Sequence, residues 1–219
     1  MLRDVLILLI GLGLLWTPRS WLRLGAPRKT RKKIASTGGP VKDRLPGDHS
    51  IWIEKEFKRR QNWIDFGRAI GGSFAVVGSV PIVVEAMIAV PSISSTQLAF
   101  SIQGVIFLAA VVIQMVRIEE RMTLFPPIFF VMGLSFAVVG WKAGTIGFGA
   151  IWVINLVLPN PVVFLTTYGS GMVILSIFFG ANPKAAVLTA ALAIMPPLVA
   201  VLLKRRLAQF RKKTKIAVR

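Results

Sequence analysis

Glu85 is the ionisable side chain that lies deepest within a long apolar segment of this sequence. Burying a carboxylate in hydrocarbon costs about 2.5–3.5 kcal/mol or more, so such an acid is expected to face protein, a cavity or a partner. One interpretation is a proton or cation relay. The other is that Glu85 is hydrated near the membrane surface or pairs with a neighbouring subunit, because five residues separate it from Pro91.

Three amide side chains share this apolar setting: Gln103, Gln114 and Asn155. Amides can line a transport pathway, but more often they form hydrogen bonds between helices, at about 0.6–2 kcal/mol each. We expect the second role. Together with Glu85, these residues form the candidate intramembrane polar site.

The segment that must position these side chains runs from residue 69 to residue 203, and it carries seven formally charged residues. Such continuous apolar sequence is typical of membrane helices of about 20 residues. The sequence therefore predicts six spans, with residues 144–180 forming either two spans or a re-entrant hairpin. The expected spans are 69–90, 97–116, 122–141, 144–158, 162–180 and 185–203.

Residues 1–21 form a separate N-terminal hydrophobic anchor. The unbroken apolar part, 5–16, is shorter than the roughly 20 residues that cross hydrocarbon. Counting from Leu2 to Trp21 gives a helix of marginal spanning length. A helix that lies in the interface or packs on a partner subunit is the alternative.

Basic residues are concentrated in three regions, which together hold 24 of the 27 Lys and Arg residues: 17–68, Arg117 with Arg121, and the tail 204–219. The positive-inside rule places a face with this charge in the cytoplasm. We therefore expect a multi-pass protein of the cytoplasmic membrane, with a basic cytoplasmic loop and a cytoplasmic tail.

Residues 22–68 comprise a basic linker followed by an amphipathic segment, 51–66. Clustered basic residues attract anionic lipid at roughly 1 kcal/mol each near the surface, although they also fix topology. Apolar side chains of 51–66 fall on one helical face, which suits a helix in the headgroup region. The candidate lipid or partner contacts are Arg28, Lys29, Arg31, Lys32, Lys33, Trp52, Phe57 and Trp63.

Several function classes find no support in the chain. It has no cysteine, which excludes thiolate chemistry, and His49 is its single histidine. No nucleophile–base set or phosphate-binding glycine loop occurs, so we predict no enzymatic activity, metal or cofactor. Asn160 and Asn182 each precede a proline, a pattern typical of a helix N-cap.

The sequence thus predicts an all-α integral membrane protein, a polytopic bundle of six to seven transmembrane helices with a basic cytoplasmic loop and an interfacial amphipathic helix. Our leading hypothesis is a non-catalytic subunit of a larger membrane assembly. Its basic face would dock protein partners or anionic lipid, and nucleic acid is a less favoured partner. The alternative is a small transporter or channel that uses Glu85 and the intramembrane amides.

Overall fold

The computed structural model describes residues 1–19, 21, 57–88, 95–118, 122–155, 158 and 160–204. This part of the chain is helical except for one short antiparallel hairpin, in which Val116 pairs with Leu124. Its elements are α1 (Leu2–Trp16), α3 (Arg60–Met87), α4 (Ser95–Met115), β1 (Val116–Ile118), β2 (Met122–Leu124), α5 (Ile128–Val138), α6 (Trp141–Ile154), α7 (Pro161–Phe178) and α8 (Pro183–Leu202).

Four of these helices are long and apolar enough to cross a membrane: α3, α4, α7 and α8. The prediction of a helical, multi-pass membrane protein is therefore confirmed to the extent of four candidate spans. Helices α1, α5 and α6 have 15, 11 and 14 residues, so the number of crossings beyond four stays a prediction.

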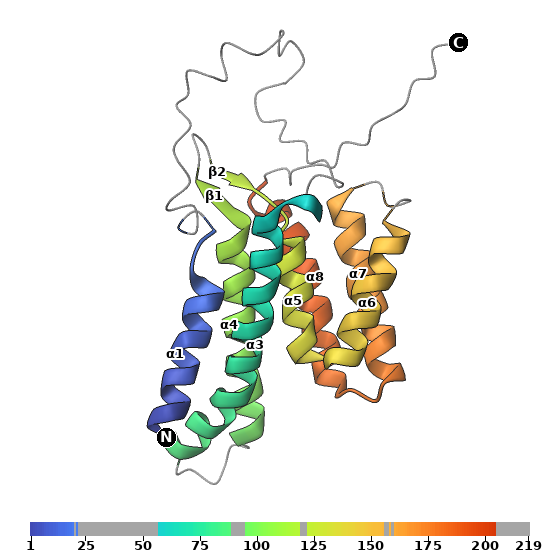
Figure 1. Ribbon diagram of the computed structural model, residues 1–219. Coiled ribbons are helices and arrows are strands. Elements are labelled where there is room, and N and C mark those ends of the chain that lie inside the picture. The colour runs from blue at the N-terminus through green and yellow to red at the C-terminus, as the bar shows by residue number, and fades with distance from the viewer. Residues whose placement is uncertain are drawn as a thin grey trace, which may run out of the picture.

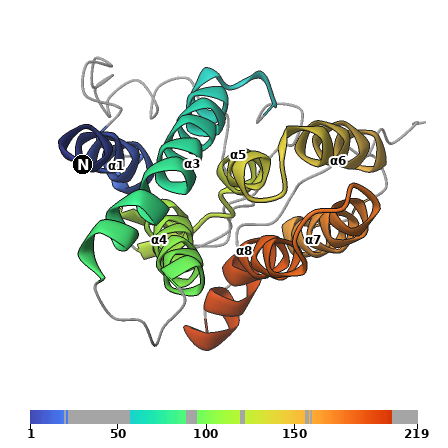
Figure 2. The same cartoon turned by 90° about the horizontal axis from the view of Figure 1, so that it is seen from below.

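The helices run side by side between two ends of a bundle (Figure 1). We call the end where α3 begins and α8 finishes the upper end, and the opposite end the lower end. Helix α5 lies centrally, between α3 and α4 on one side and α6 and α8 on the other (Figure 2). Every residue from Ile128 to Ser135 is buried. A short helix that is apolar on all sides is typical of a buried core helix, which is the role of α5.

Two close helix approaches depend on glycine. A Cβ at Gly72 of α3 would lie 2.7 Å from Cγ of Leu15 in α1, and a Cβ at Gly133 of α5 would lie 2.7 Å from the backbone oxygen of Phe66 in α3. Small residues let membrane helices pack with their backbones in near contact. Helix α3 is therefore clamped between α1 and α5.

Two predicted boundaries require correction. Residues 122–124 were expected to open a membrane helix, but they form β2, and α5 begins only after Pro126 and Pro127. Proline lacks the backbone N–H that a helix interior needs, so the helix starts later and is short.

The break expected between an interfacial helix and a span near residues 66–69 is absent, because α3 continues from Arg60 to Met87. Residues 51–56 lie outside the described part.

The two predicted asparagine caps are confirmed. Asn160 Oδ1 accepts a hydrogen bond from the Val163 N–H at 2.9 Å, and Asn182 Oδ1 accepts one from the Lys184 N–H at 2.9 Å. A proline follows each cap at the first helical position. Residues 144–180 contain most of α6 and all of α7, which are two separate helices that pack against each other.

Candidate functional site: a buried ionic cluster at the end of α1

Asp65 bridges two arginines inside the bundle. Its Oδ1 lies 3.1 Å from Nε of Arg68, one turn further along α3, and its Oδ2 lies 3.2 Å from Nε of Arg19. Asp65 and Arg68 are both buried, and only 13% of the Arg19 side chain is exposed. Removing one partner of a buried ion pair leaves an uncompensated charge, which typically costs 3–5 kcal/mol. Loss of any one of these three charged side chains would therefore leave a buried charge without its partner.

The cluster also satisfies the backbone at the end of α1. Arg68 Nη1 donates to the carbonyl of Thr17 at 2.7 Å, and Gln114 Nε2 donates to the carbonyls of Leu15 at 3.0 Å and Thr17 at 2.9 Å. Arg68 Nη2 in turn donates to Gln114 Oε1. The last carbonyls of a helix have no intrahelical partner. Side chains of α3 and α4 supply the missing donors, and the positive charge of Arg68 complements the helix dipole.

A further hydrogen bond joins two residues that flank the basic linker in sequence. Arg19 Nη2 donates to Asn62 Oδ1 at 2.5 Å, a separation of 43 residues along the chain. Trp16 Nε1 adds a longer hydrogen bond to the carbonyl of Ile106 in α4, at 3.3 Å. Arg19 and Asn62, which flank the basic linker in sequence, therefore lie next to each other in the bundle.

The aromatic ring of Phe130 completes the surroundings of Arg68. The guanidinium carbon lies 5.6 Å from the ring centroid, within the range of a cation–π contact. Phe130 belongs to the buried helix α5, so the cluster connects α1, α3, α4 and α5. Its chemistry is that of an ionic joint between helices.

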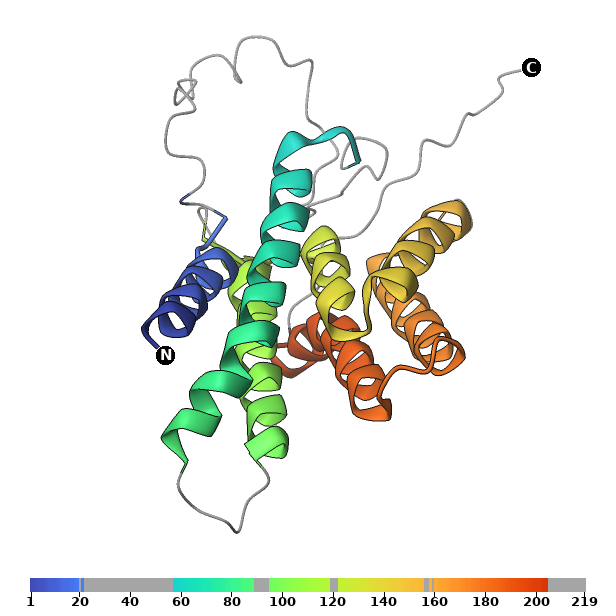
Figure 3. The ribbon, with the colours of Figure 1, turned by 60° about the horizontal axis from the view of Figure 1, so that its bottom comes forward.

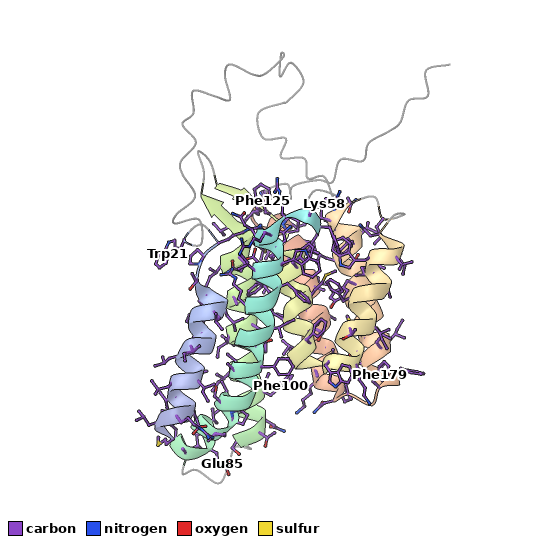
Figure 4. The ribbon with its side chains drawn as sticks, viewed as in Figure 1. Trp21, Lys58, Glu85, Phe100, Phe125 and Phe179 are labelled. Atoms are coloured by element: carbon purple, nitrogen blue, oxygen red, sulfur yellow. The ribbon has the colours of Figure 1, made fainter. Side chains whose placement is uncertain are left out.

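The structure does not bring the four predicted polar residues together. Glu85 is exposed at the lower end of α3 (Figure 4), whereas Asn155 is buried at the end of α6, where its Oδ1 has no hydrogen-bond partner among the described residues. Gln114 belongs to the ionic cluster. Gln103 lies further down α4, and its Nε2 donates to the carbonyl of Val77 at 3.3 Å.

The Gln103 contact has a specific cause. Pro81 lies four residues after Val77 in α3 and has no N–H, so the Val77 carbonyl lacks its usual helical donor. Gln103 supplies that donor from the neighbouring helix. Gln103 and Gln114 thus both bond to main-chain carbonyls that helix geometry leaves without partners.

Of the predicted lipid or partner contacts, only two lie within the described residues. Phe57 and Trp63 form an edge-to-face pair with centroids 5.2 Å apart, and each is 39% exposed. Phe57 also contacts Trp152 at 5.0 Å, and Trp63 contacts Phe129 at 5.5 Å. The two rings therefore pack on α5 and α6 of their own chain. The remaining candidates, Arg28, Lys29, Arg31, Lys32, Lys33 and Trp52, lie outside the described part.

Sequence reasoning missed the roles of Arg19, Asp65 and Arg68. The spacing of Asp65 and Arg68 was a usable signal, because residues three apart on a helix are neighbours. Arg19 offered no such signal, because its partners lie more than 40 residues away. The hydroxyl of the single tyrosine, Tyr168, was also overlooked, and it lies 2.5 Å from Oγ of Ser135 in the core.

Comparison of the chain with protein-family models, curated proteins and solved structures finds no match. Within the described residues, no group of three His, Asp or Glu side chains could hold a metal ion. Inference about function therefore depends on the geometry of the chain itself.

Proposed function

We propose that this protein is a non-catalytic integral subunit of a larger membrane assembly in the cytoplasmic membrane. Its basic face, turned to the cytoplasm, docks protein partners or anionic lipid. The observation that carries the proposal is the closed base of the basic linker. Arg19 and Asn62 join its two sides, and the buried Asp65 and Arg68 hold that joint to the helices. This joint fixes where the two ends of the linker meet the helices.

The charges of the described residues support this orientation. Lys58, Arg59 and Arg60 are exposed at the start of α3, and Lys204 follows α8, so all four lie at the upper end. Figure 4 shows Lys58 there and Glu85 at the opposite end. The positive-inside rule assigns the basic end to the cytoplasm.

The roles of the amides favour a subunit over a transporter. A transport route needs polar groups that converge along a path through the membrane. Here Gln103 and Gln114 bond to carbonyls of neighbouring helices, and Glu85 and Asn155 lie at opposite ends of the bundle. The two glutamines are therefore accounted for by hydrogen bonds between helices.

The test compares the full chain with a variant in which the five basic residues between Arg28 and Lys33 are replaced by glutamine. Both are extracted in mild detergent, and the particles are weighed by native mass spectrometry. We expect the wild type to carry a partner in fixed stoichiometry and the variant to lose it. A matched control replaces five basic residues of the tail, within 205–213, and removes the same charge. An unchanged particle mass in the linker variant would count against docking through this segment.

A further inference from the structure

The helices of the bundle differ in length, and the difference appears at the lower end. Helix α3 has 28 residues, which at 1.5 Å per residue is about 42 Å, whereas α7 has 18 residues, or about 27 Å. Figures 1 and 3 show α3 and α4 extending below the turn between α7 and α8. Figure 4 shows Glu85 of α3 at a lower level than Phe179, which follows α7. The lower end of the bundle is therefore stepped.

The contact between α3 and α5, which run in the same direction, fixes their relative depth. A Cβ at Gly133 of α5 would lie 2.7 Å from the backbone oxygen of Phe66 in α3. Helix α5 ends at Val138, five residues after Gly133, so its end is level with about Gly71 of α3. Glu85 lies 14 residues further along α3, which is about 20 Å. Helix α5 therefore stops far above the lower end of α3.

The start of α6 lies at this higher level too. A Cβ at Gly144 of α6 would lie 3.1 Å from Cα of Phe136, near the end of α5. Trp141 and Lys142, the first two residues of α6, are consequently level with the last residues of α5. Trp141 is 65% exposed, and Lys142 is exposed as well. Tryptophan and lysine at the end of a membrane helix typically mark the headgroup region.

The α1 flank of the bundle is apolar much closer to the lower end. Helix α1 runs antiparallel to α3, and a Cβ at Gly11 would lie 3.0 Å from Cβ of Ala75. Leu2 lies nine residues below Gly11, so it is nearly level with Glu85. Leu2 and Leu6 are 76% and 51% exposed. On this flank, hydrocarbon-compatible side chains thus continue about 20 Å below the level at which α6 exposes a lysine.

Helix α4 extends past its neighbour α8. A Cβ at Gly104 of α4 would lie 3.6 Å from Leu188 of α8. Helix α4 begins nine residues before Gly104, whereas α8 begins five residues before Leu188, so α4 reaches about 6 Å lower. Gln97 shares a helix face with Gly104, because the two are seven residues apart. Gln97 and Ser101 are exposed, so this face of α4 becomes polar toward the lower end.

We propose that the outer leaflet of the membrane is thinned where it meets α6 and α8. Phospholipid headgroups and water there lie against Trp141, Lys142 and Lys184, whereas on the α1 flank they lie at the level of Arg3 and Glu85. The hydrocarbon boundary is thus about 20 Å higher at α6 than at α1. The inference uses the orientation proposed above to name the leaflet, and it needs no protein partner.

Hydrophobic mismatch is the physical cause. The hydrocarbon core of a bilayer is about 30 Å thick. Helix α6 has 14 residues, or about 21 Å, and α7 reaches about 27 Å. A bilayer adapts to helices that are too short by thinning locally. Without thinning, the ammonium group of Lys142 would be placed in hydrocarbon at a depth from which its side chain does not reach the surface.

The residues of the step favour lipid headgroups over a docked protein helix. Membrane helices pack against one another through small and apolar residues. The step instead exposes an indole and two ammonium groups, and α4 adds an amide and a hydroxyl beside them. These groups are Trp141, Lys142, Lys184, Gln97 and Ser101, and all lie in the described part of the chain. Phosphates and water satisfy such groups at a membrane surface.

Two labels can be compared at equal depth on opposite flanks. Ser101 lies two residues below Gln103, which bonds to the Val77 carbonyl, so Ser101 is level with about residue 79 of α3. By the contact between α1 and α3, Leu6 is level with about residue 80. The chain contains no cysteine, so Ser101→Cys and Leu6→Cys each introduce a single site for a nitroxide. Trp141→Cys adds a label about 10 Å further from the lower end than either.

Each full-length variant is reconstituted in vesicles of phosphatidylcholine and phosphatidylglycerol. Collision rates with a water-soluble nickel complex and with oxygen report whether a label lies in water or in hydrocarbon. We expect the labels at residues 101 and 141 to collide mainly with the nickel complex and the label at residue 6 mainly with oxygen. A flat bilayer predicts the reverse order for residues 6 and 141, because residue 6 lies nearer to the lower end.

Three results would overturn the proposal. Equal nickel accessibility at residues 6 and 101 would show a level boundary. Oxygen-dominated collisions at residue 141 would place the start of α6 in hydrocarbon. Shielding of residues 101 and 141 from both reagents would show that protein, and not lipid, covers the step.

Variants of Lys142 test its part in the thinning, with the label kept at residue 141. Lys142→Leu should lower the nickel accessibility roughly twofold or more, because hydrocarbon then covers the start of α6, whereas the control Lys142→Arg should leave it unchanged. Equal values for the two variants would contradict the role of this cation. A native particle without partner proteins would refute the assembly proposal and leave these comparisons intact.

Discussion

The hydrogen bond from Gln103 to the Val77 carbonyl provides a quantitative test of how α3 and α4 are joined. Replacing Gln103 by methionine keeps a side chain of similar length but removes the donor that compensates for Pro81. Interhelical hydrogen bonds in membranes contribute about 0.6–2 kcal/mol, and the 3.3 Å separation indicates a weaker example. We therefore expect Gln103→Met to lower the free energy of unfolding by about 1 kcal/mol.

The same substitution should have little effect when Pro81 is first replaced by alanine. Alanine restores the backbone N–H at position 81, which donates to the Val77 carbonyl within α3. The two substitutions should then show a coupling free energy of about 1 kcal/mol, above the 0.3–0.5 kcal/mol within which independent sites add. Gln97→Met, at an exposed position in the first turn of α4, serves as the control and should be nearly neutral.

The assay is reversible unfolding of the full chain in mixed detergent micelles, followed by tryptophan fluorescence, for the four members of the cycle. Equal losses from Gln103→Met in the proline and alanine backgrounds would refute the reasoning. Such a result would mean that Gln103 contributes through packing rather than by bonding to a carbonyl that Pro81 leaves free.

Three further predictions follow from the described contacts. Asp65→Ala should lower the free energy of unfolding by roughly 3–5 kcal/mol, because it leaves buried arginines without their shared carboxylate. The control Lys58→Ala, at an exposed site, should lower it by less than about 0.5 kcal/mol. Comparable losses for the two variants in unfolding titrations would contradict the ionic joint. Gly133→Ala should lower the free energy of unfolding by roughly 1–3 kcal/mol, because the added Cβ meets a backbone oxygen. Gly149→Ala should leave it unchanged or raise it, and the same titrations compare the free energies of unfolding of the two variants. Glu85→Gln should leave both the free energy of unfolding and the particle mass unchanged. Ion flux in proteoliposomes tests the relay alternative, and a clear loss of flux in this variant would support that alternative.

The helical membrane character of the chain was predictable because it depends on long apolar runs. The asparagine caps at residues 160 and 182 were equally predictable, since a cap and a following proline are local signals. These features involve residues close together in sequence, and the structure confirms them.

The ionic cluster was not predictable in this way. The amphipathic pattern of residues 51–66 predicts an interfacial helix, in which a carboxylate is expected to face water, whereas the structure buries Asp65 as part of α3. Its contact with Arg19 depends on the packing of α1 against α3, and no local periodicity encodes that arrangement. The short length of α5 was missed for a related reason, because its apolar sequence extends beyond the helix into the β hairpin.

The mass of the native particle after gentle extraction tests the proposed function most directly. The full chain would be purified in mild detergent, and native mass spectrometry would give the particle mass and the identity of each component. A particle that contains this chain and other proteins in fixed stoichiometry is the predicted result. A lone monomer, or an oligomer of this chain alone, under conditions that preserve other membrane assemblies would contradict it.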